Sequence, residues 1–375
     1  MGRRIEATTP PPHASNELNE EGSIRGAFGI ANRRYLGSKT KMLPFIVELI
    51  ESLSGDIGSV LDVFAGTGVV GAALNRGNRS ILANDLLLSN VIPLRAFLET
   101  SRVDDTRITE LLGRLSSLKP DPSNYFARTF GGTYFTKQTA AQIGTIREEI
   151  ALWSRQKRIG EDEEEILLTS LLYAADRCAL TCGHYDAWRE GVADHTRDEL
   201  ILKRPRIDCE KNKGNRVFHE DANVLIRELD VDVVYIDPPY NSRQYSDTYH
   251  LLENLITWKK PPVHGKARKM ERRHIKSRYC SRVHAPVAFR DLIEHASCRH
   301  IFLSYNNMAV KGHTRSNALL SDDLIVEVLE ARGEVELYER RYKPFSAGLR
   351  AIPDHRERVF HCRVVRPPIH QRNEE

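Results

Sequence analysis

Residues 231–240 read VDVVYIDPPY, an apolar run that ends in an acid, two prolines and an aromatic residue. The apolar part predicts a buried β-strand. Prolines fix the backbone φ angle and donate no backbone hydrogen bond, so a stiff turn with available carbonyl groups is expected after the strand. The Asp237 carboxylate and the Pro238 carbonyl would suit one amino group as acceptors, and the Tyr240 ring would suit a flat nucleobase. An isolated DPPY equally fits an ordinary proline-rich turn, so the rest of the chain has to decide.

A glycine-rich sequence, GTGVVG at residues 66–71, follows another apolar run at residues 60–64, which predicts a further buried strand there. Its glycines match the spacing of the dinucleotide fingerprint, and Asp85 follows the next predicted strand, where an acid that binds ribose is expected. This pattern fits a nicotinamide cofactor or another adenosine-containing ligand, and glycines that merely pack a helix onto a strand are the alternative. A hydride-transfer enzyme has no need of DPPY after a later strand, whereas an enzyme that methylates amino groups does.

The remaining pattern predicts an α/β fold. Helical periodicity dominates residues 96–205, a further strand is expected at 301–304, and residues 334–338 and 358–365 alternate like antiparallel strands. Strand–helix alternation at both ends, with a helical insertion between them, indicates an open α/β sheet that carries a second subdomain. Residues 1–30 are polar and contain three consecutive prolines, so a disordered tail is expected there.

Composition sets mild limits on the class of protein. The 375 residues carry a formal net charge of only +4, so any affinity for polyanions must come from local basic clusters. The sequence has no apolar stretch long enough for a transmembrane helix and no apolar core of a signal peptide. The six cysteines are scattered without a CxxC pair, which predicts reduced thiols in a cytoplasmic protein and no metal site.

With both motifs in this order, the chain resembles the Dam-like DNA adenine methylase family from about Arg34 to Val365. The most specific match is the extended sequence DPPYNSRQY at residues 237–245. The other matching stretches are RYLGSKTK at 34–41, FAGTG at 64–68, TCGHY at 181–185, FHEDA at 218–222 and FLSYNN at 302–307. No chemical role is assigned to TCGHY.

The resemblance implies a Rossmann-like methyltransferase sheet with a helical target-recognition insertion, and S-adenosylmethionine as the cofactor. The residues expected to bind the cofactor are Tyr35, Lys39, Asp62, Phe64, Gly66, Gly68, Asp85 and Asp221. Tyr35 and Lys39 are expected at its methionine end, Asp85 at both ribose hydroxyls, and Asp221 at its adenine. The expected domains are a tail at 1–30, a catalytic domain at 31–95 and 210–365, a target-recognition insertion at 96–209, and a basic DNA-contacting segment at 259–285.

The catalytic residues implied are Asp237, Pro238, Pro239 and Tyr240. The amino group of adenine is a poor nucleophile, because its lone pair is delocalised into the ring. A carboxylate and a carbonyl that accept its two hydrogens favour a pyramidal nitrogen for in-line attack on a methyl group, and no metal is required. The base must leave the duplex before it can be reached, and Tyr240 is expected to stack on it. In the family, Asp at the first position of the motif is associated with adenine.

A basic stretch follows the catalytic motif: residues 259–282 hold ten cations and one acid, Glu271. Such a run is usually a solvated face, but beside a nucleobase pocket it predicts phosphate contacts, with His274 or Tyr279 at a base or sugar. The residues expected to contact DNA are Lys266, Lys269, Arg272, Arg273, Lys276 and Arg278.

The sequence therefore predicts a site-specific DNA adenine methyltransferase that acts as a monomer on duplex DNA. A cognate restriction endonuclease is left open as a partner. Two alternatives remain: an RNA adenine methyltransferase, whose pocket would be nearly the same, and a nucleic-acid-binding protein with an inactive methylase fold. The inactive fold would be expected to lack the catalytic acid or the glycines, and both are present.

Overall fold

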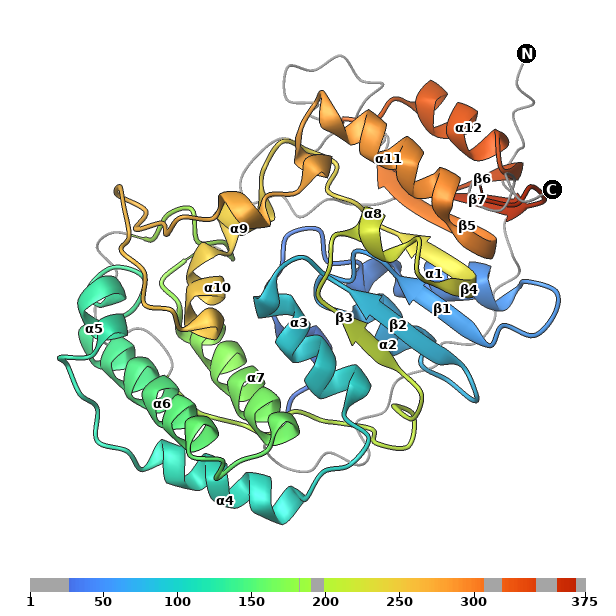
Figure 1. The fold of residues 1–375 in the computed structure, drawn as a ribbon. Helices are drawn as coiled ribbons and strands as arrows, with labels where there is room; N and C mark the ends of the chain where they lie inside the picture. Colours follow the sequence, from blue (N-terminus) through green and yellow to red (C-terminus); the bar gives the residue numbers. More distant parts are fainter. Residues whose placement is uncertain (1–26, 182, 190–198, 307–318, 342–355, 369–375) are drawn as a thin grey trace. The chain divides into compact units, whose positions relative to one another are not determined.

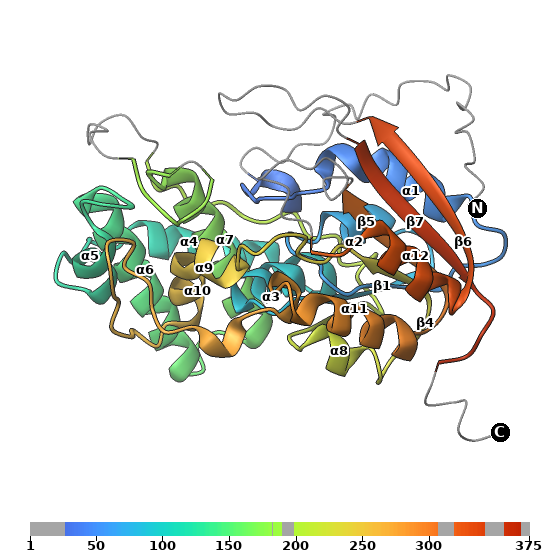
Figure 2. The same ribbon diagram turned by 90° about the horizontal axis from the view of Figure 1, so that it is seen from above.

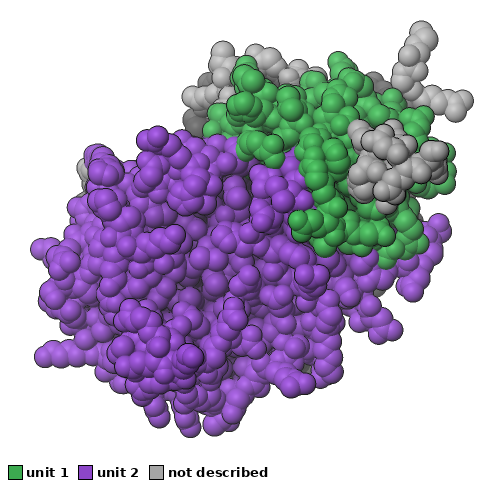
Figure 3. All heavy atoms as spheres, viewed as in Figure 1, with its two compact units in different colours: residues 1–26, 226–242, 278–375 green, residues 27–225, 243–277 purple. Residues whose placement is uncertain are grey.

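The structure is a computed structural model, and it describes residues 27–181, 183–189, 199–306, 319–341 and 356–368. The chain splits into two compact units (Figure 3): unit 1 contains residues 1–26, 226–242 and 278–375, and unit 2 contains residues 27–225 and 243–277. These units do not follow the domain boundaries expected from the sequence, and the assignment of residues 96–209 to target recognition stays a prediction. Most of the expected tail lies outside the described residues.

Unit 2 contains a parallel sheet of three strands, in the order β3-β2-β1. The strands are β1 (Ser59–Asp62), β2 (Ser80–Asn84) and β3 (Arg216–Phe218). Asp62 pairs with Ala83, and Asn84 pairs with Phe218, so the carboxyl ends of the three strands meet at one edge. The loops after these strands therefore leave the sheet side by side, as a ligand site at this edge requires.

The first strand was expected to reach Phe64, and this expectation is wrong, because β1 ends at Asp62. Beyond that point the Val63 carbonyl accepts a hydrogen bond from the Asn84 side chain, at 3.1 Å, and Ala65 N–H donates to the Asn84 carbonyl at 2.8 Å. Asn84 Nδ2 also donates to the Glu220 carbonyl at 3.1 Å, so one buried amide fastens the ends of all three strands.

Helices make up most of the remainder of unit 2. Their bounds are α1 (Leu43–Glu51), α2 (Val69–Leu74), α3 (Leu88–Leu94), α4 (Asp105–Ser116), α5 (Tyr125–Phe130), α6 (Lys137–Arg155), α7 (Glu161–Cys178), α8 (Ala222–Leu225), α9 (Tyr245–Thr248) and α10 (His250–Thr257), with a π-helical turn η3 (Arg95–Glu99) and 3₁₀ turns η1 (Ile30–Asn32), η2 (Thr40–Met42) and η4 (Arg273–Ile275). In Figure 1, α4–α7 gather away from the strands of this unit. Helices were predicted to dominate residues 96–205, and this prediction is confirmed as far as Cys178, where α7 ends.

Helices α5 and α6 are joined by one polar side chain. Asn124 is the N-cap of α5: its Oδ1 accepts from Ala127 N–H at 2.8 Å, and its Nδ2 donates to the Ala141 carbonyl of α6 at 2.8 Å. There is room for this cap because the residue of α6 beside Asn124 is a glycine, Gly144. A Cβ atom on Gly144 would lie 2.0 Å from Asn124 Oδ1, so no other residue leaves room for this cap.

Unit 1 contains four strands in the order β4-β5-β7-β6. They are β4 (Asp230–Ile236), β5 (Ser297–Asn306), β6 (Gly333–Arg341) and β7 (Arg356–Val364). β4 and β5 are parallel, whereas β7 runs antiparallel to both β5 and β6, as Figure 2 shows for this part of the sheet. The helices of unit 1 are α11 (His284–His295), α12 (Asp322–Glu330) and the 3₁₀ turn η5 (Arg278–Cys280). The strands predicted at 231–236 and 301–304 and the antiparallel pair near the end are confirmed.

The two units confirm the predicted α/β class, with parallel strands, an antiparallel hairpin and helices that pack on them. Val60, Leu61, Val233 and Val234 are fully buried, as expected for strands covered on both faces. Over the described ranges, no helix is long and apolar enough to cross a membrane.

Candidate active site

The best-defined polar feature of unit 2 is the carboxylate of Asp85, directly after β2. Its Oδ2 accepts from Gly66 N–H at 2.9 Å, and its Oδ1 accepts from Leu87 N–H at 2.8 Å and from Asn90 Nδ2 at 3.0 Å. An ionised carboxylate has about four lone-pair positions, so the three donors among the described residues leave one position, on Oδ2. Burial raises the pKa of Asp85, while the three donors and the charge of Arg33 act to lower it.

The two glycines of the predicted cofactor loop have different functions. Both have left-handed backbone, with φ of +55° at Gly66 and +78° at Gly68, which a side chain would strain. A Cβ atom on Gly68 would lie 2.3 Å from Leu94 and 2.9 Å from Ile30, so packing alone requires a glycine here, and a role of Gly68 in ligand binding stays a prediction. A Cβ atom on Gly66 would lie 3.2 Å from the Tyr35 ring, and the Gly66 N–H contacts Asp85.

Tyr35 lies in a stack of three tyrosines. Its ring is parallel to Tyr249 within 7°, at a centroid distance of 4.7 Å, and stacks on Tyr245 at 5.5 Å. The Tyr35 hydroxyl accepts from Asn90 Nδ2 at 3.2 Å, and burial raises the pKa of this tyrosine well above its usual value, so the hydroxyl stays neutral. Sequence reasoning assigned no role to Tyr249 or Asn90, and both are buried, nearly free of contact with solvent.

Contacts of the structure thus bring together Tyr35, Gly66 and Asp85. The other expected cofactor residues have these positions: Lys39 and Asp62 are buried, Phe64 is partly exposed, and Asp221 caps α8 by accepting from Asn223 N–H at 2.9 Å. The capping oxygen of Asp221 is Oδ1. Roles for these four residues in ligand binding stay predictions.

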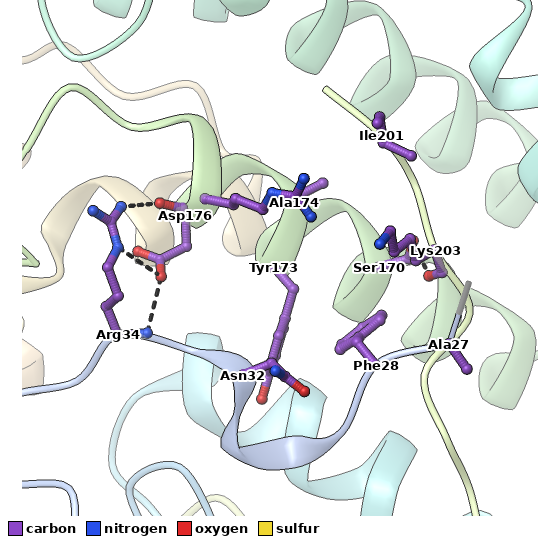
Figure 4. A pocket seen from close by; sticks show the side chains of 11 residues that line it. Ala27, Phe28, Asn32, Arg34, Ser170, Tyr173, Ala174, Asp176, Ile201 and Lys203 are labelled. Atoms are coloured by element: carbon purple, nitrogen blue, oxygen red, sulfur yellow. Dashed lines mark hydrogen bonds and ion pairs between the residues drawn. The ribbon is translucent and has the colours of Figure 1, made fainter. Parts of the chain in front are cut away.

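Arg34 turns away from this site although it adjoins Tyr35 in sequence. Its backbone N–H donates to Asp176 Oδ2 at 3.1 Å, and its guanidinium pairs with the same carboxylate (Figure 4). These residues line a cavity of about 320 Å³ together with Ala27, Phe28, Asn32, Ser170, Tyr173, Ala174, Arg177, Ile201 and Lys203. Among the described residues that line it, none belongs to the predicted cofactor set, so this cavity is separate from the Asp85 site.

The TCGHY stretch has a structural function within unit 2. Tyr185 is fully buried, and its hydroxyl donates to Asp176 Oδ1 at 2.8 Å. Its carbonyl accepts from the Tyr134 hydroxyl at 2.8 Å and from His250 Nε2 at 2.9 Å. Burial lowers the pKa of His250 to about 4, so this histidine is neutral at ordinary pH. Cys182 lies outside the described residues.

The DPPY motif lies in unit 1, where it follows the last residue of β4. Asp237, Pro239 and Tyr240 are partly exposed, and Pro238 is buried. The Tyr240 ring meets Tyr305 of β5 edge to face, at a centroid distance of 6.4 Å and an angle of 84°. The Tyr305 hydroxyl accepts from Leu319 and Leu320 N–H groups, at 3.2 and 3.1 Å, so the partner of Tyr240 is itself fixed. The motif therefore places a partly exposed acid and a partly exposed aromatic ring directly after the end of a strand.

The structure divides the expected DNA-contacting residues by their partners. Lys269 forms an ion pair with Asp186 at 2.9 Å, and Arg272 forms one with Asp247. These two side chains are only 20% and 21% exposed. In contrast, the Arg273 side chain is 86% exposed although it pairs with Glu271 at 3.5 Å, and three further members of the set are exposed: Lys266, Lys276 and, in unit 1, Arg278.

One expectation for the basic stretch is wrong. Tyr279 was considered for a base or sugar contact, but it is only 3% exposed, and its hydroxyl donates to the Ala288 carbonyl of α11 at 3.0 Å. It therefore belongs to the core of unit 1, whereas His274 is exposed. No group of three or more metal-binding side chains is found in the described part of the chain.

A strand-end DPPY motif and a glycine loop with a fixed acid define an amino-methyltransferase of the α/β class. A model of the D12 class N6 adenine-specific DNA methyltransferase family matches residues 35–316, and the chain belongs to this family. The match confirms the resemblance inferred from the sequence, together with the predicted enzyme class and its action on adenine in DNA.

The named relatives are methyltransferases of restriction–modification type. The chain is 30% identical over 321 residues to the type II methyltransferase M.NlaIII of Neisseria lactamica, covering 84% of this chain and 92% of that protein. It is 33% identical over 290 residues to the modification methylase StsI of Streptococcus sanguinis, covering 74% of this chain and 44% of that protein. It is 27% identical over 323 residues to the type II methyltransferase M.CviAII of Paramecium bursaria Chlorella virus 1, covering 85% and 94% of the two proteins.

Proposed function

We propose that this enzyme transfers the methyl group of S-adenosylmethionine to the exocyclic amino group of an adenine that is rotated out of duplex DNA. The observation that carries the proposal is the Asp85 carboxylate, which three donors among the described residues fix beside the glycine loop, leaving one acceptor position. A hydroxyl of a ribose ring is the matching donor. A methyltransferase of this family requires a methyl donor, and an adenosine-containing one fits this acid.

The residues of unit 2 fit such a cofactor. Gly66 lets the loop pack closely on the Tyr35 ring, and its N–H holds the Asp85 carboxylate, so the loop positions two residues of the proposed set. Asp85 would accept from a ribose hydroxyl, and Tyr35 and Lys39 would hold the methionine end. Gly68, Asp62, Phe64 and Asp221 complete the proposed set. When bound, S-adenosylmethionine supplies an electrophilic methyl group on a sulfonium centre.

The proposed catalytic groups are Asp237, Pro238, Pro239 and Tyr240. The Asp237 carboxylate and the Pro238 carbonyl would accept the two amino hydrogens of adenine and increase the nucleophilicity of the nitrogen. Both residues follow directly after the buried strand β4, which fixes the course of the backbone at this point, and groups placed in this way need little reorganisation. Tyr240 would stack on the rotated base, with its ring held by Tyr305. The proton is lost to Asp237 or solvent during or after the transfer.

Further proposals concern the partners. Duplex DNA is the expected substrate, with phosphate contacts from the exposed cations of the basic stretch and target reading from residues 96–209. We also propose that the enzyme acts as a monomer in the cytoplasm. A cognate restriction endonuclease is proposed as its partner in restriction–modification.

The decisive experiment measures tritium transfer from labelled S-adenosylmethionine to duplex DNA and to an RNA duplex of the same sequence. We expect label in DNA adenine N6 with the wild-type enzyme and none with Asp237→Ala. Label in RNA rather than DNA would overturn the proposed substrate, and binding of a nicotinamide cofactor without any binding of S-adenosylmethionine would overturn the proposed cofactor.

A further inference from the structure

Asn90, in α3, connects two residues of the proposed cofactor site. It is 1% exposed. Its Nδ2 donates to Asp85 Oδ1 at 3.0 Å and to the Tyr35 hydroxyl at 3.2 Å, so each of its two hydrogens has a different acceptor. Its Oδ1 accepts from Arg33 Nη1 at 2.8 Å. One side-chain amide therefore contacts both the acid proposed for the ribose and the tyrosine proposed for the methionine end.

The orientation of this amide is determined by its neighbours. A guanidinium only donates hydrogen bonds, so the group that faces Arg33 must be the amide oxygen. An ionised carboxylate only accepts them, so the group that faces Asp85 must be the amide nitrogen. By binding the amide oxygen of Asn90, Arg33 directs the amide nitrogen toward Asp85 and Tyr35.

Arg33 is a buried cation without a carboxylate at ion-pair distance among the described residues. It is 5% exposed, and besides Asn90 its Nη1 donates to the Ser89 carbonyl at 3.1 Å. Nε and Nη2 have no hydrogen-bond partner in the described part of the chain. The guanidinium carbon lies 5.4 Å from the centroid of the Tyr35 ring and 5.6 Å from that of Tyr249. A buried charge of this kind is costly unless nearby π faces and an opposite charge compensate it.

We propose that Arg33 and Asn90 form a positioning pair that fixes the orientation of both Asp85 and Tyr35 for the cofactor. This inference rests on the proposed function of the Asp85 site. Neither residue need touch the cofactor: Asn90 acts through its two hydrogen bonds, and Arg33 acts through the orientation of Asn90 and through its charge.

The environment of Asp85 supports this role. Burial raises its pKa, and the Asn90 amide and the charge of Arg33 are among the influences that lower it. Tyr35 is the other titratable group beside it and stays neutral, because burial raises its pKa well above the usual value. Glu253 of α10 faces the start of α3 and accepts from Leu88 and Ser89 N–H groups, at 3.2 and 2.8 Å. Loss of Asn90 or Arg33 should therefore move the protonation of Asp85 to higher pH.

The test is the binding of S-adenosylhomocysteine to the full chain, followed by calorimetry as a function of pH. In Asn90→Leu we expect affinity at neutral pH to fall by roughly tenfold. This is the effect of losing one charge-assisted hydrogen bond, the one that a displaced Asp85 would no longer make to the ligand's ribose. Affinity should also disappear at a higher pH than in the wild type as the solution is acidified. Arg33→Met should move the same midpoint in the same direction. In an Asp85→Ala background, Asn90→Leu should change affinity by less than it does in the wild-type background, because only its action through Tyr35 remains there.

Asn212→Leu is the matched control. Asn212 is also a buried amide of unit 2, and it donates to the Phe97 and Thr100 carbonyls at 3.0 and 2.9 Å. Its loss should lower the melting temperature but leave the pH midpoint of binding unchanged. The positioning pair would be overturned if neither Asn90→Leu nor Arg33→Met shifted the pH midpoint of binding. If Asn90→Leu does not fold, an unshifted midpoint in Arg33→Met would overturn it. A wild-type chain that binds no S-adenosylhomocysteine would instead overturn the proposed function.

Discussion

The Asp85 site and the basic stretch both belong largely to unit 2, yet their polar groups are held in opposite ways. Asp85 is fixed by two backbone N–H groups and a buried amide, whereas Arg273 and Lys276 of the basic stretch are exposed. Fixed groups suit a small ligand, because little side-chain entropy is lost on binding. Exposed cations suit a polyanion, because counterion release needs charge more than exact geometry. The comparison shows which sequence motifs specify geometry and which specify only charge.

The largest effect is expected at the other preorganised group, Asp237. Asp237→Ala should reduce methyl transfer by about 100-fold or more, the usual contribution of a positioned polar group. Affinity for S-adenosylmethionine should be retained, since the role proposed for this residue is in activation of the amine. Methyl transfer and cofactor binding should be measured in parallel. Turnover above about a tenth of the wild-type rate would contradict the proposed mechanism.

The next effect sharpens the preorganised side of the comparison. Asp85→Ala should weaken S-adenosylmethionine binding by about 1.5–3 kcal/mol, the contribution of one hydrogen bond to a charged group. One bond is expected and not two, because three donors already occupy Asp85. Affinity for DNA should change little. A loss near twice this size, measured by calorimetry, would show that the carboxylate rearranges to accept from both hydroxyls.

The smallest effect tests the exposed side. The double change Arg273→Gln with Lys276→Gln should reduce the slope of log affinity for duplex DNA against log salt by about 1.8, or about 0.9 for each phosphate contact. The double change Lys269→Gln with Arg272→Gln is the matched variant, and its slope should change less, because these two cations are largely buried in their ion pairs with Asp186 and Asp247. Equal slopes in the two variants would mean that exposure of the cation does not decide which cations meet DNA.

How far the sequence predicted the structure depended on the length of each pattern. The strands β4 and β5 span seven and ten residues and were located correctly, while β3 spans only three residues and has no measurable period. The first strand was predicted to reach Phe64 but ends at Asp62. The Asn84 side chain takes the place of strand pairing at Val63, and a pattern of apolar residues does not show this.

The candidate site was predictable where the backbone dictates the residue. The positive φ angles at Gly66 and Gly68 require glycine, so the loop was visible in the sequence. Asn90 and Tyr249 were not, because their role arises from contacts with residues far away along the chain, such as the 2.7 Å bond from Leu36 N–H to the Tyr249 hydroxyl. The burial of Tyr279 was not visible either, because it depends on how the η5 turn packs on the neighbouring helix α11.

The Asn124 cap described between α5 and α6 has a consequence for how this chain and its relatives diverge. Position 144 is restricted to glycine only as long as an amide side chain occupies position 124. Once a smaller residue replaces Asn124, the space beside α6 opens and alanine, a better helix former, becomes acceptable at position 144. The two positions should therefore change together during evolution, and a chimaera that takes the two helices from different relatives should inherit both residues from one parent.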